Sequence, residues 1–220
     1  IESPDGHRYR VEGTTLHDQG NQPPAWETGR GHQGTPVSQG RLTMNHISLF
    51  TGYGGMELGL RLAGIELRTV LYVEIEPYCQ DIIKARIRDG HFDDCPIWPD
   101  IRTLDGSVFA GKVGIISGGF PCQPFSVAGK QLGESDERNL WPETRRIISE
   151  VGPEYCLLEN VPNITTGNGR DRPAYGGTVL GDLAEMGYDI KYGVTSASDA
   201  GAPHLRKRLW ILAHSNANAI

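Results

Sequence analysis

Residues 46–55 read HISLFTGYGG, and within this stretch a mostly apolar run is followed by a glycine-rich segment. The apolar run 47–50 is typical of a buried β-strand, and the glycines that follow permit a tight turn. A helical pattern then begins and continues over 55–63. The stretch therefore predicts a strand, a glycine-rich turn and a helix, and the free N–H groups at the start of such a helix favour an anionic or carboxylate group. A plain connection between strand and helix is the alternative, because the spacing is not GxGxxG.

The same alternation continues along the rest of the chain. Short runs rich in Val, Ile and Leu are typical of strands buried on both faces of a parallel sheet. The predicted strands are 47–50, 69–73, 113–117, 155–158, 190–195 and 209–213. The predicted helices are 55–63, 77–88, 142–151 and 178–186. This order predicts a doubly wound, mostly parallel α/β sheet, which binds ligands at the carboxyl ends of its strands.

Composition excludes several classes of protein. The 220 residues include 21 Lys and Arg against 27 Asp and Glu, a net charge of −6, so bulk positive charge cannot drive nucleic-acid binding and any such contact is local. The four cysteines form no CxxC pair, which argues against a disulfide scaffold or a zinc ribbon. No apolar run approaches about 18 residues and no signal-peptide pattern opens the chain, so we expect a cytoplasmic protein without membrane association.

The first 44 residues differ in composition from the remainder. They are rich in Gly, Pro, Gln, His and Thr and show no apolar period, which predicts a disordered or non-native extension. The folded domain is predicted over 45–220, and Met44 is as consistent with a start codon as with an internal methionine. Because the chain begins with Ile1 and stops soon after an apolar run, we expect that one or both ends were cut from something longer.

Two carboxylates follow predicted strands in the first half of the domain. Glu74 lies roughly 20 residues beyond the glycine turn, a position suited to ribose hydroxyls. A solvated strand-end glutamate is the alternative, and Glu76 lies close enough to be confused with it. Asp100 suits an adenine amino group, although a plain turn aspartate is more common. Together they indicate a cofactor that contains ribose.

The segment GGFPCQPFS at 118–126 follows the strand predicted over 113–117. Its glycines and prolines prevent a helix or strand from continuing, so Cys122 is expected on a shaped loop at the functional edge of the sheet. A thiolate there is a strong nucleophile. Cys79, Cys95 and Cys156 are instead predicted to be inert, buried small hydrophobic residues.

Two further polar clusters lie in the second half. Glu159 is the third residue of the run LLEN at 157–160, near the end of a predicted strand, where partial desolvation would raise its pKa and let it donate a proton to a ring nitrogen; an ordinary strand-end glutamate is the alternative. Arg206 and Arg208 form the tightest basic cluster and share one face if that segment is extended. Paired arginines suit a phosphate or a carbonyl oxygen, whereas a solvated charge run is the alternative.

The order of these motifs resembles the DNA (cytosine-5)-methyltransferase family over about 46–213. The resemblance is most specific in PCQ at 121–123, ENV at 159–161 and RKR at 206–208. The resemblance implies a Rossmann-like fold that uses S-adenosylmethionine, incomplete at the C-terminus. It implies methyl transfer to C5 of a cytosine flipped out of double-stranded DNA, through a covalent adduct with Cys122. Glu159 would be the acid at N3, and Arg206 and Arg208 would lie near O2 and the catalytic loop.

The resemblance also implies binding residues. Those that would contact the cofactor are Phe50, Gly52, Gly54, Gly55, Glu74, Ile75, Asp100, Ile101 and Leu140. Those that would contact the substrate are Pro121, Gln123 and Asn160. No metal is expected.

The chain departs from the family pattern in two respects. His204 stands where the family usually has Gln before the two arginines. The family also continues with a target-recognition region and closing motifs that this sequence lacks, which predicts a catalytic fragment or half of a split enzyme completed by a second chain.

Three other functions compete with this one. An enzyme of the same fold that methylates cytosine in transfer RNA would show the same motifs, and a non-catalytic remnant would keep them without activity. A nicotinamide-dependent dehydrogenase is disfavoured, because the glycine spacing is wrong and PCQ would have no role.

Overall fold

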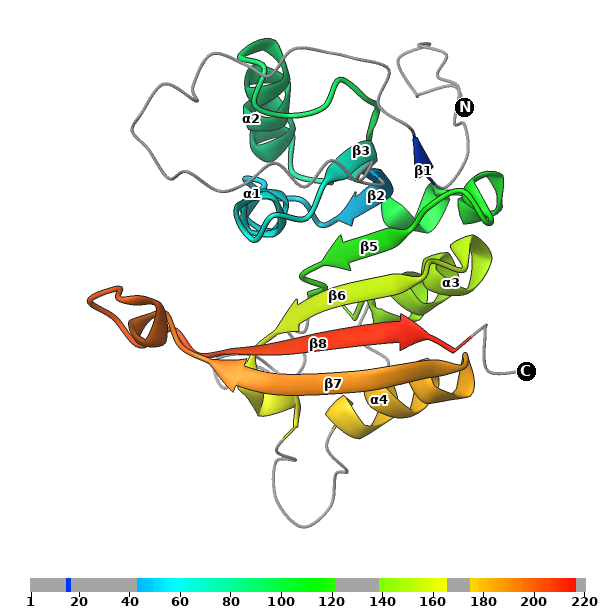
Figure 1. The fold of residues 1–220 in the computed structure, drawn as a ribbon, viewed down its shortest axis with the longest axis vertical. Helices are drawn as coiled ribbons and strands as arrows, with labels where there is room; N and C mark the ends of the chain where they lie inside the picture. Colours follow the sequence, from blue (N-terminus) through cyan, green and yellow to red (C-terminus); the bar gives the residue numbers. More distant parts are fainter. Residues whose placement is uncertain (1–14, 17–42, 122–138, 166–174, 217–220) are drawn as a thin grey trace, which may run out of the picture.

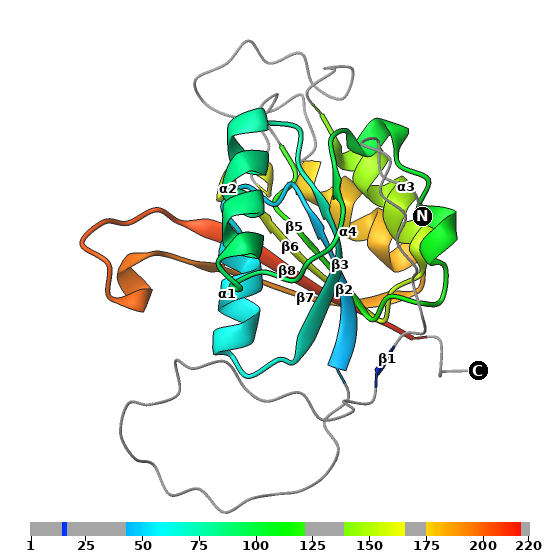
Figure 2. The ribbon, with the colours of Figure 1, turned by 90° about the horizontal axis from the view of Figure 1, so that it is seen from above.

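The computed structural model describes residues 15–16, 43–121, 139–165 and 175–216. A central sheet carries helices on both faces, with α1 and α2 on one side and α3 and α4 on the other (Figure 2). The helices are α1 Gly55–Leu62, α2 Pro77–Arg88, α3 Trp141–Val151 and α4 Tyr175–Glu185. The strands are β1 Thr15–Leu16, β2 Thr43–Leu49, β3 Leu67–Val73, β4 Ile97–Trp98, β5 Ile115–Gly118, β6 Tyr155–Asn160, β7 Tyr188–Thr195 and β8 Arg208–Ser215.

The sheet has the order β4-β3-β2-β5-β6-β8-β7, with β1 pairing antiparallel to β2 (Figure 1). Strands β2 to β6 pair in parallel, whereas β8 is antiparallel to both of its neighbours. The chain adds strands outward from β2 through β3 to β4, then returns to β5 on the other side of β2. The topological switch point therefore lies at the carboxyl ends of the neighbouring strands β2 and β5, where sheets of this kind bind ligands.

The doubly wound, mostly parallel sheet predicted from the sequence is confirmed. Every predicted strand and helix is present within a few residues of its predicted bounds, and α2 spans 77–88 as predicted. The two-residue strand β4 was not predicted, because it is too short to show a pattern. The prediction for residues 1–44 falls almost wholly outside the described residues; Thr15 and Leu16 pair with Met44 and Thr43 at the start of β2, and the domain boundary stays a prediction.

The central strands are buried on both faces. In β2 every residue from Asn45 to Leu49 is buried, including the polar residues Asn45, His46 and Ser48, as expected for a strand covered on both faces of the sheet. Cys95 and Cys156 are buried as predicted, and Cys79 is half-buried. None of the helices in the described ranges has the length and apolar character needed to cross a bilayer.

Candidate active site

The glycine turn after β2 adopts left-handed backbone conformations. Gly52 has φ 57° and Gly54 has φ 77°, values that glycine adopts without strain. A Cβ on Gly54 would lie 1.9 Å from a ring carbon of Phe92, so this position also requires the absence of a side chain. Phe50 has φ 54° although it is not glycine, and such strained residues cluster at ligand sites.

Glu74 connects this turn to the end of β3. Its carboxylate accepts a hydrogen bond from the Gly52 N–H at 2.7 Å and another from the Glu76 N–H at 2.8 Å. Because a carboxylate can accept about four hydrogen bonds, Glu74 keeps acceptor capacity for a ligand hydroxyl. Glu76, the other glutamate considered for the ribose role, contributes only its backbone N–H to this arrangement.

The predicted adenine-binding positions follow β4. Asp100 caps the 3₁₀ helix Ile101–Thr103, accepting from the Arg102 N–H and from Arg102 Nε at 3.0 Å each. The hydrogen bond from the Arg102 side chain is the largest cause that lowers the pKa of Asp100. Ile101 is buried in the main core, and Ile75 is exposed. Leu140 is half-buried at the residue preceding α3. None of these contacts tests whether Asp100, Ile101, Ile75 and Leu140 bind a cofactor, so those roles stay predictions.

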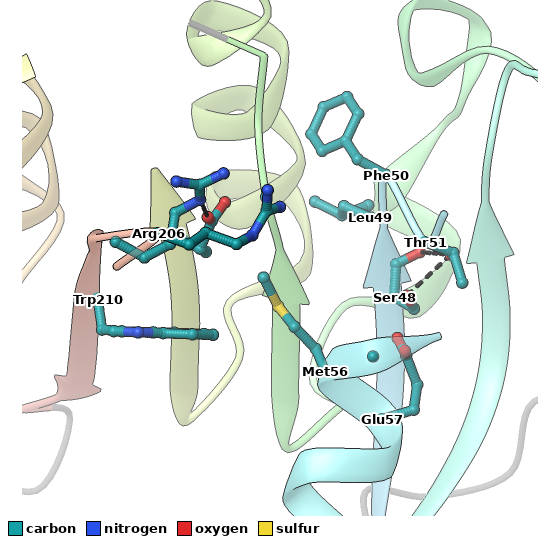
Figure 3. A pocket seen from close by; sticks show the side chains of 12 residues that line it. Ser48, Leu49, Phe50, Thr51, Met56, Glu57, Arg206 and Trp210 are labelled. Carbon is teal, nitrogen blue, oxygen red and sulfur yellow. Dashed lines mark hydrogen bonds and ion pairs between the residues drawn. The ribbon is translucent and has the colours of Figure 1, made fainter. Parts of the chain in front are cut away.

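A cavity of about 360 Å³ opens at the switch point, between the ends of β2 and β5 (Figure 3). It brings together residues from the glycine turn, α1, the end of β6 and the start of β8. The lining residues are Ser48, Leu49, Phe50, Thr51, Gly55, Met56, Glu57, Gly119, Glu159, Arg206, Arg208 and Trp210. Of the predicted site residues, the cavity thus collects Phe50, Gly55, Glu159, Arg206 and Arg208.

Glu159 forms an ion pair inside this cavity. Its Oε1 lies 2.5 Å from Arg208 Nε, and both side chains are about a quarter exposed. Burial raises the pKa of Glu159, and the charges of Arg208 and Arg206 oppose that shift. A Cβ on Gly119 would lie 3.0 Å from Glu159 Oε2, so the glycine after β5 leaves room for the carboxylate. The carboxyl predicted to hold a proton is therefore present in a partly desolvated, arginine-paired position.

The antiparallel direction of β8 places the arginines beside Glu159. Glu159 pairs with Trp210 and Asn160 pairs with Leu209, so β8 begins where β6 ends. Arg206 precedes the strand with φ 29°, a strained value for a residue with a side chain. The segment at Arg206 is not extended, yet both arginines line the same cavity.

Asn160 anchors the loop that leads toward Cys122. Its side chain is 3% exposed and donates a hydrogen bond to the Phe120 carbonyl at 2.9 Å. The Asn160 Oδ1 accepts from the Val161 N–H at 2.8 Å, so the amide is held at both ends. Pro121, next after the anchored residue, is half-buried. Cys122 and Gln123 lie outside the described residues, and their predicted roles stay predictions.

The cavity also contains residues that the motif reading did not single out. Met56, Glu57 and Trp210 line it, and Glu57 is only 2% exposed. The available signal was the placement of Glu57 in the first turn of a helix directly after the glycine turn. Across the described ranges, no group of three His, Cys, Asp or Glu side chains is arranged to hold a metal ion.

Comparison with known proteins identifies the family. The model for the C-5 cytosine-specific DNA methylase family matches residues 44–220. The chain belongs to this family. The match covers every element from β2 to β8, so the cavity between β2, β6 and β8 lies within the family's domain.

Relatives in the C-5 cytosine-specific DNA methylase family include bacterial enzymes. Type II methyltransferase M.NgoMIV of Neisseria gonorrhoeae is 34% identical over 170 residues, which cover 77% of this chain and 51% of the relative. Type II methyltransferase M.PspPI of Psychrobacter sp. (strain TA137) is 38% identical over 168 residues, covering 76% of this chain and 38% of the relative. The chain thus spans about half the length of these relatives or less.

Solved structures show the same fold. A putative DNA modification methyltransferase encoded within an Escherichia coli prophage is 28% identical, with a TM-score of 0.60 over 80% of this chain and 48% of that one. Spodoptera frugiperda DNMT2 superposes with a TM-score of 0.63 over 79% of this chain and 50% of that one. At 23% sequence identity, the similarity to this protein shows a shared fold and nothing more.

Proposed function

We propose that this chain is the catalytic part of a DNA (cytosine-5)-methyltransferase, which transfers a methyl group from S-adenosylmethionine to C5 of a cytosine in double-stranded DNA. The observation that carries the proposal is the cavity at the switch point, where Glu159 is paired with Arg208 beside Arg206. A proton donor with cationic neighbours is what a cytosine ring needs at its N3 and O2 edge.

The residues present fit S-adenosylmethionine. Open space beside Gly55 leaves the start of α1 accessible, and Glu74 holds the adjacent turn while keeping acceptor capacity for ribose hydroxyls. Phe50 and Leu140 would contact the apolar parts of the molecule, and Asp100 would accept from the adenine amino group. When bound, S-adenosylmethionine supplies a sulfonium methyl group that an activated C5 carbon takes.

Cys122 and Glu159 would activate that carbon as a unit. In the proposed reaction the Cys122 thiolate bonds to C6 of the ring, while Glu159 delivers a proton to N3 and makes C5 nucleophilic. After C5 is methylated, loss of its proton to water breaks the bond from C6 to sulfur and restores the thiolate. Glu159 takes back the N3 proton as the ring regains its neutral form. The raised pKa of Glu159 supports this role, because the carboxyl must hold a proton near neutral pH.

The base must leave the duplex to reach this cavity, which costs a few kcal/mol. Arg206 and Arg208 would offset part of that cost by donating hydrogen bonds to O2 of the flipped cytosine. Asn160 supports the geometry indirectly, because it holds the backbone at Phe120, two residues before Cys122.

Transfer of a labelled methyl group from S-adenosylmethionine to duplex DNA tests the proposal with the full 220-residue chain. Glu159→Gln should reduce transfer about 10²- to 10⁴-fold while keeping cofactor affinity. Glu154→Gln is the matched control, since Glu154 is an exposed glutamate just before the same strand. Transfer that survives Glu159→Gln unchanged would remove this residue from the mechanism.

A second assay addresses the covalent step and the nucleic acid. The unmodified protein should form an adduct with duplex DNA that contains 5-fluorocytosine, and Cys122→Ser should not. Transfer RNA offered in parallel separates the two substrate classes, because methylation of transfer RNA alone would overturn the assignment to DNA. Binding of S-adenosylmethionine without transfer to either nucleic acid would instead favour a non-catalytic remnant.

A further inference from the structure

Burial alternates along β8 and separates two faces of the sheet. Leu209, Ile211 and Ala213 are buried in the main core. Between them, Trp210 is half-buried and Leu212 is 42% exposed. Because successive side chains of a strand point to opposite faces, Trp210 and Leu212 lie on the face that is turned away from this core.

The strand pairings extend this second face across three strands. Glu159 pairs with Trp210, and the half-buried Leu157 of β6 pairs with Leu212. On the other side of β8, Leu212 pairs with the exposed Lys191 of β7. We call the side chains of Leu157, Trp210 and Leu212 the open face. It is an apolar surface with a cation at its margin.

The open face lies on the same side of the sheet as α1. Trp210 and Met56 of α1 line one cavity (Figure 3). However, α1 and α2 lie at the β2 and β3 end of the sheet (Figure 1), and α3 and α4 pack on the opposite side (Figure 2). Within the described part of the chain, the exposure of Leu212 shows that no helix covers this side of β8.

The open face has the dimensions of one α-helix. Three neighbouring strands about 4.8 Å apart span about 10 Å, which matches the diameter of a helix with its side chains. The 8 residues of β8 extend for about 26 Å, the length of a helix of about 17 residues. In doubly wound sheets helices cover both faces, because an uncovered face leaves apolar side chains in water.

We propose that the open face is the docking surface for one amphipathic α-helix from the part of the enzyme that this chain does not span. This inference rests on the proposed function, which takes the chain as the catalytic part of a longer enzyme. The matched regions cover 51% of M.NgoMIV and 38% of M.PspPI, so the remainder of such an enzyme is long enough to supply the helix.

The size of the open face favours this occupant over a second copy of the chain. Its area of about 260 Å², from about 10 Å by about 26 Å, is well below the roughly 800 Å² that each partner buries in a standard interface. The area therefore suits an element that further contacts of the same enzyme hold in place. An apolar stripe on the docked helix would cover Leu157 and Leu212, and an acidic residue on its flank would complement Lys191.

Titration of the 220-residue chain with a separate polypeptide tests the docking surface. The probe is the part of M.NgoMIV outside its 170 matched residues, and the corresponding part of M.PspPI is a second probe. Calorimetry should show a complex with at least one of them. Leu212→Glu should weaken this complex about 10- to 100-fold, because docking would remove water from a carboxylate on an apolar surface.

Tyr192→Glu is the matched control. Tyr192 of β7 is 61% exposed and pairs with Ile211, a residue of the main core, so it lies on the opposite face of the sheet. This variant should bind each probe as tightly as the unmodified chain. Equal weakening by the two variants, or a complex that Leu212→Glu leaves unchanged, would overturn the docking surface.

A milder substitution keeps the test valid if Leu212→Glu does not fold. Leu212→Ser alters the same exposed position, and the complex should weaken in the same direction, with circular dichroism showing that each variant is folded. Sedimentation of the chain alone tests a second copy as the occupant. A dimer that dissociates in Leu212→Ser or Leu212→Glu would overturn the proposed helix.

The outcomes separate this inference from the proposed function. Absence of a complex with both probes would overturn the docking surface and leave the assignment as a methyltransferase intact. A complex that forms through the open face but transfers no methyl group to duplex DNA would overturn the proposed function and leave the docking surface in place.

Discussion

Acidification should destabilise this fold through a single buried histidine, His46. It lies in β2 with no exposed surface, its Nδ1 3.1 Å from Thr69 Oγ1 and its Nε2 2.9 Å from Ser117 Oγ. The ring thus bridges β2 to both neighbouring strands, β3 and β5. Burial, with a smaller contribution from the charge of Arg61, lowers the pKa of His46 from 6.5 to about 3.

The sign of the effect follows from where the proton binds. Below pH 6.5 the unfolded chain protonates this histidine, whereas the folded protein does not until about pH 3. The contribution of His46 to stability is therefore complete above pH 6.5 and is lost progressively as the pH falls toward 3. The two pKa values correspond to a loss of about 2 kcal/mol between pH 7 and pH 5, and of about 4 kcal/mol at pH 3. Domains are typically stable by about 5–15 kcal/mol, so the loss is measurable.

Urea unfolding of the wild-type protein and His46→Gln at pH 7, 6 and 5 measures this effect. The stability difference between the two proteins should change by about 2 kcal/mol over that range in the direction that favours the variant at low pH. The difference is the right quantity, because the raised pKa values of Glu57 and Glu159 act in the opposite direction and are common to both proteins. His91→Gln, at an exposed position, is the control. A difference that stays constant within about 0.5 kcal/mol would refute the buried, neutral state of His46.

Three further substitutions test the framework of the site. Gly54→Ala should destabilise the protein by about 1–3 kcal/mol and weaken binding of S-adenosylmethionine, since a Cβ would meet the Phe92 ring at 1.9 Å; unchanged thermal unfolding would contradict this contact. Asn160→Ala should lower methyl transfer with little change in cofactor affinity, because its bond to the Phe120 carbonyl holds the backbone two residues before Cys122, the proposed nucleophile; single-turnover kinetics separate the two effects, and a loss of affinity alone would argue against this role. Glu74→Ala should weaken cofactor binding in calorimetry while circular dichroism shows the fold intact, and unaltered affinity would remove it from the cofactor site.

The main elements of this fold are readable from local sequence. The run 47–50 predicts a buried strand, and β2 is in fact buried from Asn45 to Leu49. A strand covered on both faces favours such residues. Pro77 starts α2 as the sequence predicts, since proline fits the first turn of a helix, where no N–H partner is required. The glycine turn was also predictable from the sequence, because glycine is the residue that most readily adopts the left-handed conformations found at Gly52 and Gly54.

The candidate site depends on distant pairings that no local pattern encodes. Strand residues of the same composition can run in either direction, and only the antiparallel pairing of β8 with β6 brings Arg208 within 2.5 Å of Glu159.

The amino-acid sequence by itself determined the succession of strands and helices, the glycine turn and the family motifs, because backbone sterics and hydrophobic periodicity act over a few residues. The tertiary structure alone decided that Glu57 is buried and lines the same cavity as Glu159. Burial and electrostatic environment are properties of the packed carboxyl ends of the strands, where residues as far apart in the chain as Glu57 and Glu159 line one cavity.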